Sequence, residues 1–153
     1  MQIIRHAKIV SDHWTHVADG PIPSEGCISV SFARWKDQRT ELLSRVDDLG
    51  LRVSSEDPIE EVTEDLDRFQ MIGLDFPVFT DGRLFSVART LRDHYGYQGE
   101  IRAMGGFIRD QIFFLSRVGV DSFEMEEDSD LDGALSALDD FSVSYQVSSE
   151  VRN

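Results

Sequence analysis

The sequence predicts an α/β fold built from repeated βα units, with a mainly parallel sheet that is open or curled into a partial barrel-like layer. Apolar strand-like runs alternate with helix-like segments along most of the chain. The chain has 153 residues, of which 41% are hydrophobic, enough for the core of one domain. A closed eightfold βα barrel needs about 200 residues, so we expect a smaller layer.

We expect a single domain over residues 1–153, with three parts. Residues 1–32 hold a hairpin, a loop and a strand, residues 33–146 hold the βα repeats, and residues 147–153 form a frayed tail. Within the first part, the apolar residues on both sides of His6-Ala7 predict a short β-hairpin over residues 3–14. Residues 18–26 are rich in Gly and Pro and read as a loop, and a strand follows over residues 27–32.

The first two helices are predicted from apolar spacing. From Arg34 the apolar residues recur every three or four positions, so we expect a helix that ends at Gly50. Its apolar face would consist of Trp35, Leu42, Leu43, Val46 and Leu49. After a strand at residues 51–55, Asp57 is expected to cap a second helix with Pro58 in its first turn. Its buried stripe would be Ile59, Val62, Leu66 and Phe69.

The alternation continues to the end of the chain. Residues 71–76 and 100–105 read as strands, separated by a helix that ends at Gly96. Another helix over residues 108–115, ending near Gly119, precedes a strand at 121–126, and residues 129–141 and 142–146 read as the last helix and strand. Phe107, Phe113, Phe114 and Leu115 surround their helix rather than lining one stripe. We therefore expect burial on more than one side, under a flanking layer or at a homo-oligomer seam.

Composition excludes several classes of function. The net charge of −14 argues against a protein that binds duplex nucleic acid or an anionic membrane. No apolar run is as long as a membrane span, which needs about 20 residues, and the first residues do not resemble a secretory signal. We therefore expect a cytoplasmic protein. Cys27 is the only cysteine, which excludes an internal disulfide or a thiolate-held cluster.

Cofactor and metal motifs are missing as well. Neither a dinucleotide fingerprint nor a phosphate loop occurs, so no cofactor is expected, and a flavin site without a recognisable motif is the remaining alternative. His6, His13 and His16 cluster near the start, but strand alternation separates His6 from the other two. No Cys or Glu lies at ligand spacing, and no metal site is expected.

One part of the sequence predicts a ligand site. In a parallel α/β sheet, ligands bind at the carboxyl ends of the strands. A polar turn with an arginine follows the strand at 71–76, and the next strand carries an arginine before a Gly-Gly turn into a polar helix start. Arginines and helix N-termini suit sulfate, phosphate or carboxylate. The predicted anion site is Asp81, Gly82, Arg83, Arg102, Arg109, Asp110 and Gln111.

Ion pairing is the alternative explanation of the same arginines. Arg83 would then pair with Asp81 or Asp75, and Arg102 with Glu100 or Asp110, because a buried arginine needs a partner whatever its role. Arg89 and Asp93 are four residues apart in the same predicted helix, which is the spacing of an exposed ion pair.

The sequence also resembles a known family. Residues 76–123 contain, in order, FTDGR, AR-x-LR, GYxGExRA and RDQ, and with similar stretches elsewhere they resemble the bacterial domain of unknown function 934. Family-like positions are Asp81, Gly82, Arg83, Arg89, Arg92, Arg102, Arg109, Asp110 and Gln111. The chain departs from the family pattern at 117–123, where RVGVDSF stands in place of a cysteine-containing segment.

The resemblance implies a role in assimilatory sulfite reduction, for which members are often described as probable oxidoreductases. The sequence shows no electron carrier, so we expect an accessory protein of sulfate assimilation that binds an oxyanion, with sulfite reductase or another sulfur-assimilation protein as partner. The alternative is a small enzyme, possibly an oxidoreductase, that acts on an anionic sulfur or phosphate compound.

Overall fold

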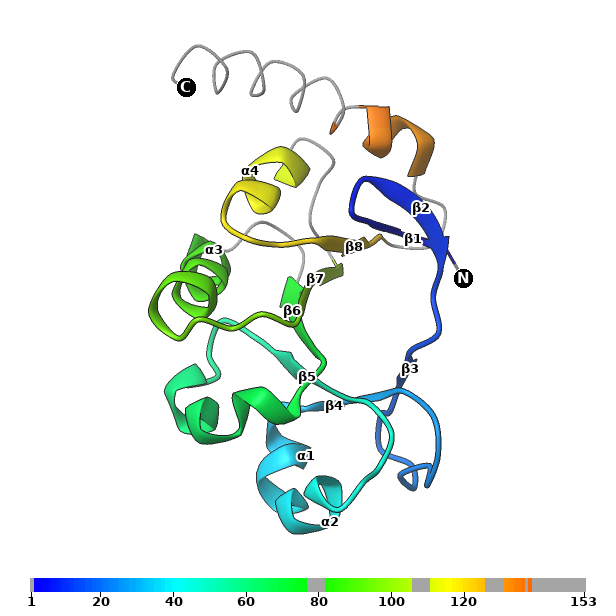
Figure 1. The fold of residues 1–153 in the computed structure, drawn as a ribbon, viewed down its shortest axis with the longest axis vertical. Helices are drawn as coiled ribbons and strands as arrows, with labels where there is room; N and C mark the ends of the chain where they lie inside the picture. The colour runs from blue at the N-terminus through cyan, green and yellow to red at the C-terminus, as the bar shows by residue number, and fades with distance from the viewer. Residues whose placement is uncertain (1, 77–81, 106–110, 126–130, 137, 139–153) are drawn as a thin grey trace.

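Within the residues that the structure describes, eight strands form one sheet in the order β2-β1-β8-β7-β6-β5-β4-β3 (Figure 1). The computed structural model describes residues 2–76, 82–105, 111–125, 131–136 and 138. The strands are β1 (Gln2–Arg5), β2 (Lys8–Ser11), β3 (Thr15–His16), β4 (Ile28–Ser31), β5 (Leu49–Val53), β6 (Met71–Phe76), β7 (Glu100–Gly105) and β8 (Ser122–Glu124). β3 to β8 run parallel, and β1 is antiparallel to both β2 and β8. The mainly parallel α/β sheet is confirmed, with an antiparallel hairpin added at one edge.

The sheet is curled into a half-barrel. Its two edge strands, β2 and β3, are consecutive in the chain and are joined by residues 12–14 alone. Four Cα–Cα steps from Ser11 to Thr15 span at most about 14 Å, so the two edges must approach each other. Figure 1 shows the strands bending around a common interior, with this link on the open side.

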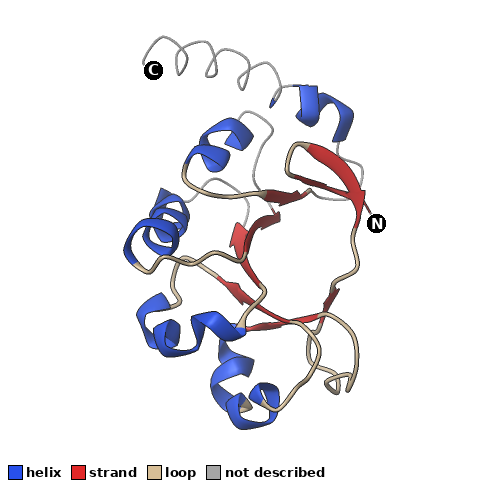
Figure 2. Ribbon diagram, in the orientation of Figure 1, coloured by secondary structure: helices blue, strands red, loops and turns tan. Residues whose placement is uncertain are grey.

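The helices cover the convex side of the sheet (Figure 2). They are α1 (Phe32–Asp37), α2 (Arg39–Leu43), the 3₁₀ helix η1 (Ile59–Arg68), α3 (Gly82–Arg89), the π-helical turn η2 (Thr90–His94) and α4 (Ile112–Arg117), and residues 131–136 are also helical. Leu84, Ala88 and Leu91 of α3 and η2 belong to one buried apolar cluster together with strand residues such as Leu74 and Ile101. The main core therefore lies between the helices and the convex face.

The two faces of the sheet differ in chemistry. Side chains alternate along a strand, and register partners share a face. One face carries the apolar residues that join the core with the helices, such as Val30, Leu51 and Leu74. The opposite, concave face is the one on which Arg52 pairs in register with Gly73, and Gly73 with Arg102. The parallel strands thus place Ser29, Ser31, Gly50, Arg52, Met71, Gly73, Asp75, Glu100, Arg102, Met104, Ser122 and Glu124 on the concave face.

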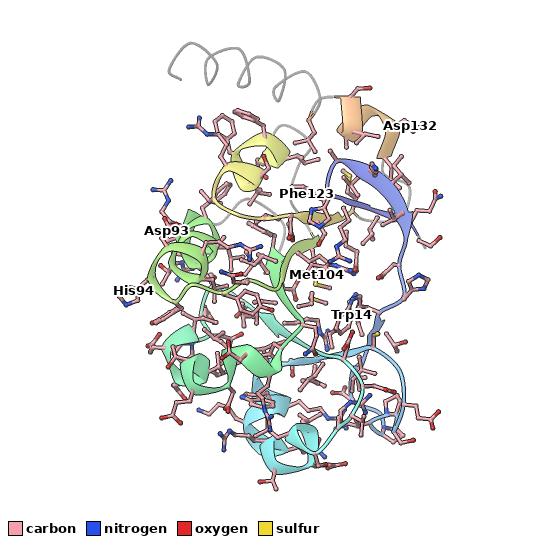
Figure 3. All side chains as sticks on the ribbon, viewed as in Figure 1. Trp14, Asp93, His94, Met104, Phe123 and Asp132 are labelled. Carbon is pink, nitrogen blue, oxygen red and sulfur yellow. The ribbon has the colours of Figure 1, made fainter. Side chains whose placement is uncertain are left out.

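Two glycines make room for large side chains on the concave face. A Cβ on Gly50 would lie 3.1 Å from Trp14, and a Cβ on Gly73 would lie 2.6 Å from Met104 Sδ. Figure 3 labels Trp14 and Met104, which project into the space that the strands enclose. The prediction that Gly50 ends a helix is therefore wrong, because Gly50 lies inside β5 and lets Trp14 pack.

The predicted helix over residues 34–49 is also shorter and divided. α1 begins at Phe32, because Ser31 Oγ accepts a hydrogen bond from Arg34 N, and the helix is interrupted at Gln38. α2 ends at Leu43, where Ser44 Oγ donates to Glu41 O. Val46 is 98% exposed, so it belongs to no apolar face. The apolar spacing continues past the end of the helix only by chance, because Val46 lies in the loop that follows α2.

The segment at 57–69 keeps its predicted buried stripe but not its predicted geometry. Ile59, Val62, Leu66 and Phe69 are all buried, as expected. The helix is 3₁₀ rather than α, and Pro58 is its N-cap residue. Asp57 instead accepts a hydrogen bond from Ser54 N at 2.8 Å.

Two other expectations about helix surfaces need correction. Arg89 makes no ion pair or hydrogen bond within the described part of the chain, and Asp93 lies in the π-helical turn that starts at Thr90. A π-helical turn contains more residues than an α-helical turn, so Asp93 does not lie on the same helix face as Arg89. Phe114 is 55% exposed, so the described part of the chain does not cover the face of α4 that carries it. A homo-oligomer seam there stays a prediction.

The remaining predicted elements agree with the structure or fall outside it. The hairpin turns at His6 and Ala7, which have φ angles of 51° and 62°, as the twist of a two-residue hairpin requires. β6 and β7 match the predicted strands, and Gly96 ends its helix with φ of 64°. The predicted last strand and frayed tail, at residues 142–146 and 147–153, lie outside the described residues.

Candidate functional site

The concave face holds a group of ionisable side chains that lie in mutual contact. We call it the interior charge cluster, and it consists of Asp12, His16, Glu100, Arg102 and Glu124. Glu100 and Arg102 come from β7, Glu124 from the end of β8, and His16 from the edge strand β3. Asp12 lies in the short link that brings the two edges of the sheet together. The curl of the sheet is therefore what assembles the cluster.

Arg102 is the centre of the cluster. Its side chain is 1% exposed. Nε donates to Glu100 Oε2 at 2.9 Å, and Nη1 donates to Asp12 Oδ1 at 3.1 Å and to Glu124 Oε1 at 2.8 Å. Ser122 Oγ donates to the same Glu100 oxygen at 2.6 Å. One buried guanidinium thus holds three carboxylates from three separate parts of the chain.

The charges of the cluster stabilise one another. Burial alone would lower the pKa of Arg102, but Glu100, Asp12 and Glu124 outweigh it, and the pKa lies above its ordinary value. Burial alone would raise the pKa of Glu124, but hydrogen bonds and charge from His16 and Arg102 hold it below its ordinary value. Arg102 and Glu124 are therefore charged in the folded protein, which makes an ionised interior rather than a neutral one.

His16 links the cluster to β4. Its Nε2 lies 2.8 Å from Glu124 Oε1, and its Nδ1 lies 2.5 Å from Ser29 Oγ. The side chain of His16 is 22% exposed and that of Glu124 is 11% exposed, whereas Ser29 is fully buried. An imidazole fixed from both sides beside a partly accessible carboxylate can pass a proton to a bound molecule. Ser29 has no access to a ligand and orients the ring.

Three of these residues also have the geometry of a metal site. One ligand atom each from Asp12, His16 and Glu124 lies within 4.8 Å of the other two, the one such group among the residues that the structure describes. Two carboxylates and an imidazole suit a divalent transition metal. Arg102 Nη1 already contacts Asp12 Oδ1 and Glu124 Oε1, so this guanidinium occupies the cation position between them. The residues therefore fit a metal poorly while Arg102 is in place.

Next to the cluster, a hollow of about 410 Å³ opens at the carboxyl ends of β3, β4 and β5. We call it the mouth hollow. It is lined by Val17, Ala18, Asp19, Ser31, Ala33, Arg34, Asp37, Gln38 and Arg52. Its volume is in the range of small-molecule sites, and its position is where parallel α/β sheets bind ligands.

Arg52 contributes an incompletely bonded guanidinium to the mouth hollow. Its Nη2 donates to the carbonyl oxygen of Val17, whereas its Nε is buried and has no hydrogen-bond partner. Burial lowers the pKa of Arg52, and the charges of Asp75 and Glu124 only partly offset this effect. Burial likewise raises the pKa of Asp75, despite the charge of Arg52. The nearby carboxylates therefore do not fully compensate the charge of Arg52 for its removal from water.

Arg34 is the second guanidinium of the mouth hollow. Its Nε donates to Gln38 Oε1 at 2.8 Å, and its Nη1 donates to Ala18 O at 2.6 Å. These acceptors are uncharged. Within the described residues, neither Arg34 nor Arg52 forms an ion pair with a carboxylate. Two positive charges thus face one hollow without a neutralising contact.

The anion site predicted from the sequence is placed only in part. Asp81, Arg109 and Asp110 lie outside the described residues. Gly82 begins α3 and Arg83 is exposed in its first turn, whereas Gln111 is the N-cap residue of α4. Arg102 lies on the concave face, and its N–H groups donate to carboxylates. Its pairing with Glu100, which was the alternative to an anion site, is therefore confirmed. The predicted anion site itself stays a prediction.

Other family-like residues have structural contacts. Arg92 donates to the carbonyl oxygens of Gly119, Tyr97 and Gly99 at 3.0, 2.8 and 2.7 Å. It therefore ties the turn after η2 to the loop before β8. Cys27 is half-buried, and burial raises the pKa of its thiol, which favours the less reactive protonated form.

Most of the interior charge cluster and the mouth hollow are not predictable from the sequence. Glu124 lies 108 positions after His16 in the chain, so only the folded sheet brings it to His16 and Asp12. Arg52 and Ser31 do carry a signal, because both lie near the carboxyl ends of parallel strands, on the face opposite the apolar one. The alternation of side chains between the two faces is visible in the sequence, but no sequence pattern indicates that the concave face is enclosed.

Comparisons with known proteins place the chain in a family without a known activity. None of the curated proteins and none of the solved structures searched matches it. Among the described residues, no helix is both long and apolar enough to span a bilayer. A family model matches residues 50–153, which include Arg52, Arg102 and Glu124. Because this match covers more than half of the chain, the protein belongs to the family described as "Bacterial protein of unknown function (DUF934)".

Proposed function

We propose that the protein binds a small oxyanion at the mouth hollow and serves assimilatory sulfite reduction as an accessory protein. The observation that carries the binding part is Arg52, a part-buried guanidinium whose Nε lacks a hydrogen-bond partner beside a hollow of about 410 Å³. An anion there would supply the missing acceptor and the missing negative charge.

The position of the mouth hollow supports the same conclusion. Arg52 and Ser31 lie at the carboxyl ends of adjacent parallel strands, in register with each other. Arg34 approaches from α1, so a tetrahedral or pyramidal oxyanion would meet donors from a strand and a helix. This proposal keeps the predicted ligand class and moves it to different arginines. Sulfite is the member of the class that the family resemblance suggests.

A small enzyme acting on an anionic sulfur or phosphate compound is the second candidate function. His16 and Glu124 favour it, because they form a hydrogen-bonded pair of proton-transfer groups that is partly exposed. Asp75 is electrostatically coupled to Arg52, Glu124 and His16, so the ligand position and the acid–base pair belong to one electrostatic unit. Turnover would then depend on His16, whereas binding alone would not.

Ligand binding tests the first part of the proposal. Purified protein is heated with sulfite, sulfate or phosphate, and the melting temperature is followed. An anion at about 100 times its Kd stabilises the folded form by about 2.7 kcal/mol, which corresponds to roughly 5–10 °C for a chain of this size. Arg52→Met should remove this shift. The matched control is Arg89→Met, because Arg89 is exposed and makes no ion pair among the described residues.

Growth tests the second part. A strain without the gene is expected to grow poorly on sulfate as the sole sulfur source and normally on cysteine. The wild-type gene should restore growth, and the Arg52→Met gene should not. Normal growth of the deletion strain on sulfate would remove the role in sulfite reduction and leave the binding proposal intact. Co-purification with sulfite reductase would identify the partner, and a homo-oligomer would be seen in the same preparation by its mass.

A further inference from the structure

Asp75 differs from the other described carboxylates of the concave face, because it makes neither a hydrogen bond nor an ion pair within the described part of the chain. Glu100, Asp12 and Glu124 all accept hydrogen bonds from Arg102. Asp75 lies near the carboxyl end of β6 and is exposed. A ligand can therefore reach this carboxylate without displacing a partner.

Asp75 and Arg52 are neighbours on this face but are not in contact. Arg52 pairs in register with Gly73, which lies two residues before Asp75 in β6. With strands about 4.8 Å apart and a rise of about 3.3 Å per residue, the two Cα atoms are about 8 Å apart. A Cβ on Gly73 would lie 3.4 Å from Cγ of Arg52, so the arginine leans over β6. Among the described residues, its guanidinium still bonds only to the carbonyl oxygen of Val17.

Neither group is compensated by the other. Of the carboxylates that act on Arg52, Asp75 has the largest effect, yet burial still lowers the pKa of the arginine. The charge of Arg52 likewise fails to prevent burial from raising the pKa of Asp75, and the smaller effects of Glu124 and His16 oppose each other. Arg52 Nε is buried without an acceptor. A donor without an acceptor and a carboxylate without a donor thus lie on adjacent strand ends.

A ligand that joins these two groups must accept hydrogen bonds from one and donate a hydrogen bond to the other. An oxyanion that keeps a proton does both, because its bare oxygens accept from Arg52 and its O–H donates to Asp75. A fully deprotonated oxyanion such as sulfate has acceptors alone. Its negative charge would be repelled by the carboxylate of Asp75.

We infer that the site selects oxyanions that keep a proton, such as hydrogenphosphate or hydrogensulfite, and that Asp75 determines this specificity by accepting the ligand's O–H. The inference rests on the proposed function, because it names the protonation state of the ligand that Arg52 binds. Asp75 acts here as a filter between ions of similar size and shape. Arg52 supplies the affinity that all of them share.

Phosphate and sulfate test this inference, because both are tetrahedral ions of similar size and only phosphate keeps a proton near neutral pH. Calorimetric titration of the full chain is expected to show phosphate binding about tenfold more tightly than sulfate, the gain of one charge-assisted hydrogen bond. In Asp75→Asn the amide can donate as well as accept, so sulfate should bind as tightly as phosphate. Asp93→Asn is the matched control (Figure 3), because it removes the same charge at an exposed position in η2 and should keep the wild-type preference.

Sulfite provides a second measurement on the same variants. It loses its proton as the pH rises through neutrality, so its affinity for the wild type should fall on the alkaline side. In Asp75→Asn this fall should be smaller, because the variant has no carboxylate to repel the deprotonated ion. A fall of the same size in both proteins would contradict the role of Asp75.

The outcomes separate this inference from the function on which it rests. Equal binding of phosphate and sulfate by the wild type, tighter binding of sulfate, or a phosphate preference that survives in Asp75→Asn overturns the filter. Binding that is lost in Arg52→Met would still keep the anion proposal. Failure of phosphate, sulfate and sulfite to bind overturns both. Because Asp75 is exposed, the variant is expected to fold, and its circular dichroism spectrum and melting temperature confirm this before titration.

Discussion

His16 and Glu124 are separated by 108 positions in the sequence, yet Nε2 of one lies 2.8 Å from Oε1 of the other. The contact joins the edge strand β3 to the end of β8 across the open side of the half-barrel. It is possible only because residues 12–14 bring the two edges together. The same contact lowers the pKa of Glu124, which makes it visible in the pH dependence of stability.

Acidification should weaken the folded protein through Glu124. Its folded-state pKa lies below the ordinary 4.5, so its contribution is complete above that value and is lost as the pH falls through the folded-state pKa. The raised pKa values of Asp75 and Asp121 act in the opposite direction. We therefore compare wild type with Glu124→Gln by urea unfolding from about pH 6 to pH 3. The gap in the free energy of unfolding should shrink on acidification, and a constant gap would contradict the assignment.

Arg102→Met should destabilise the fold by about 3–5 kcal/mol, because it leaves Glu100, Asp12 and Glu124 without their shared cation. Urea denaturation measures the loss. Arg89→Met is the matched control and should change stability by less than about 0.5 kcal/mol, since Arg89 is exposed. A loss below about 1 kcal/mol for Arg102→Met would mean that the cluster is not held by this guanidinium.

Removal of Arg102 should also create a metal site. With the guanidinium gone, a divalent ion can lie between Asp12, His16 and Glu124, whose ligand atoms are within 4.8 Å of one another. Zn²⁺ or Mn²⁺ is expected to raise the melting temperature of Arg102→Met and to leave that of the wild type unchanged. Adding Asp12→Asn to the variant should abolish the effect. An equal shift in the wild type would show that Arg102 does not exclude the ion.

Gly105→Ala should cost about 1–3 kcal/mol in the free energy of unfolding. A Cβ at this position would lie 2.3 Å from the carbonyl oxygen of Phe76, and the φ of +88° is strained for any residue with a side chain. Gly20→Ala serves as the control, because no atom lies within 4 Å of its added Cβ. Guanidinium chloride unfolding of both variants provides the comparison, and equal midpoints would be inconsistent with the close approach of β6 and β7.

The strands and the buried stripes were predictable from the sequence, because they depend on neighbours in the chain. β6 and β7, with the stripe from Ile59 to Phe69, follow from local apolar spacing alone. Val46 and Gly50 were misplaced because a period of three to four can continue by chance beyond a helix end. The antiparallel contact of β1 with β8 has no local signal.

The candidate site was harder to predict for a related reason. The pairing of Arg102 with Glu100 is local and was foreseen as an alternative, whereas its contacts with Asp12 and Glu124 depend on the curl of the sheet. Arg52 belongs to no recognisable sequence motif. Its importance comes from a buried Nε without a hydrogen-bond partner, which only the folded structure reveals. Sequence patterns identify which residues lie on one face, but not which faces become enclosed.

The antiparallel seam between β1 and β8 has a consequence during translation. A ribosome adding about 5–20 residues per second makes His16 roughly 5–20 s before Glu124. A two-stranded hairpin is marginally stable by itself, so the first strands must wait for a partner that is synthesised late. In a nascent chain stalled before residue 122, the edge of β1 that pairs with β8 would be unpaired and the interior charge cluster would lack Glu124. Such a chain would be expected to bind a chaperone.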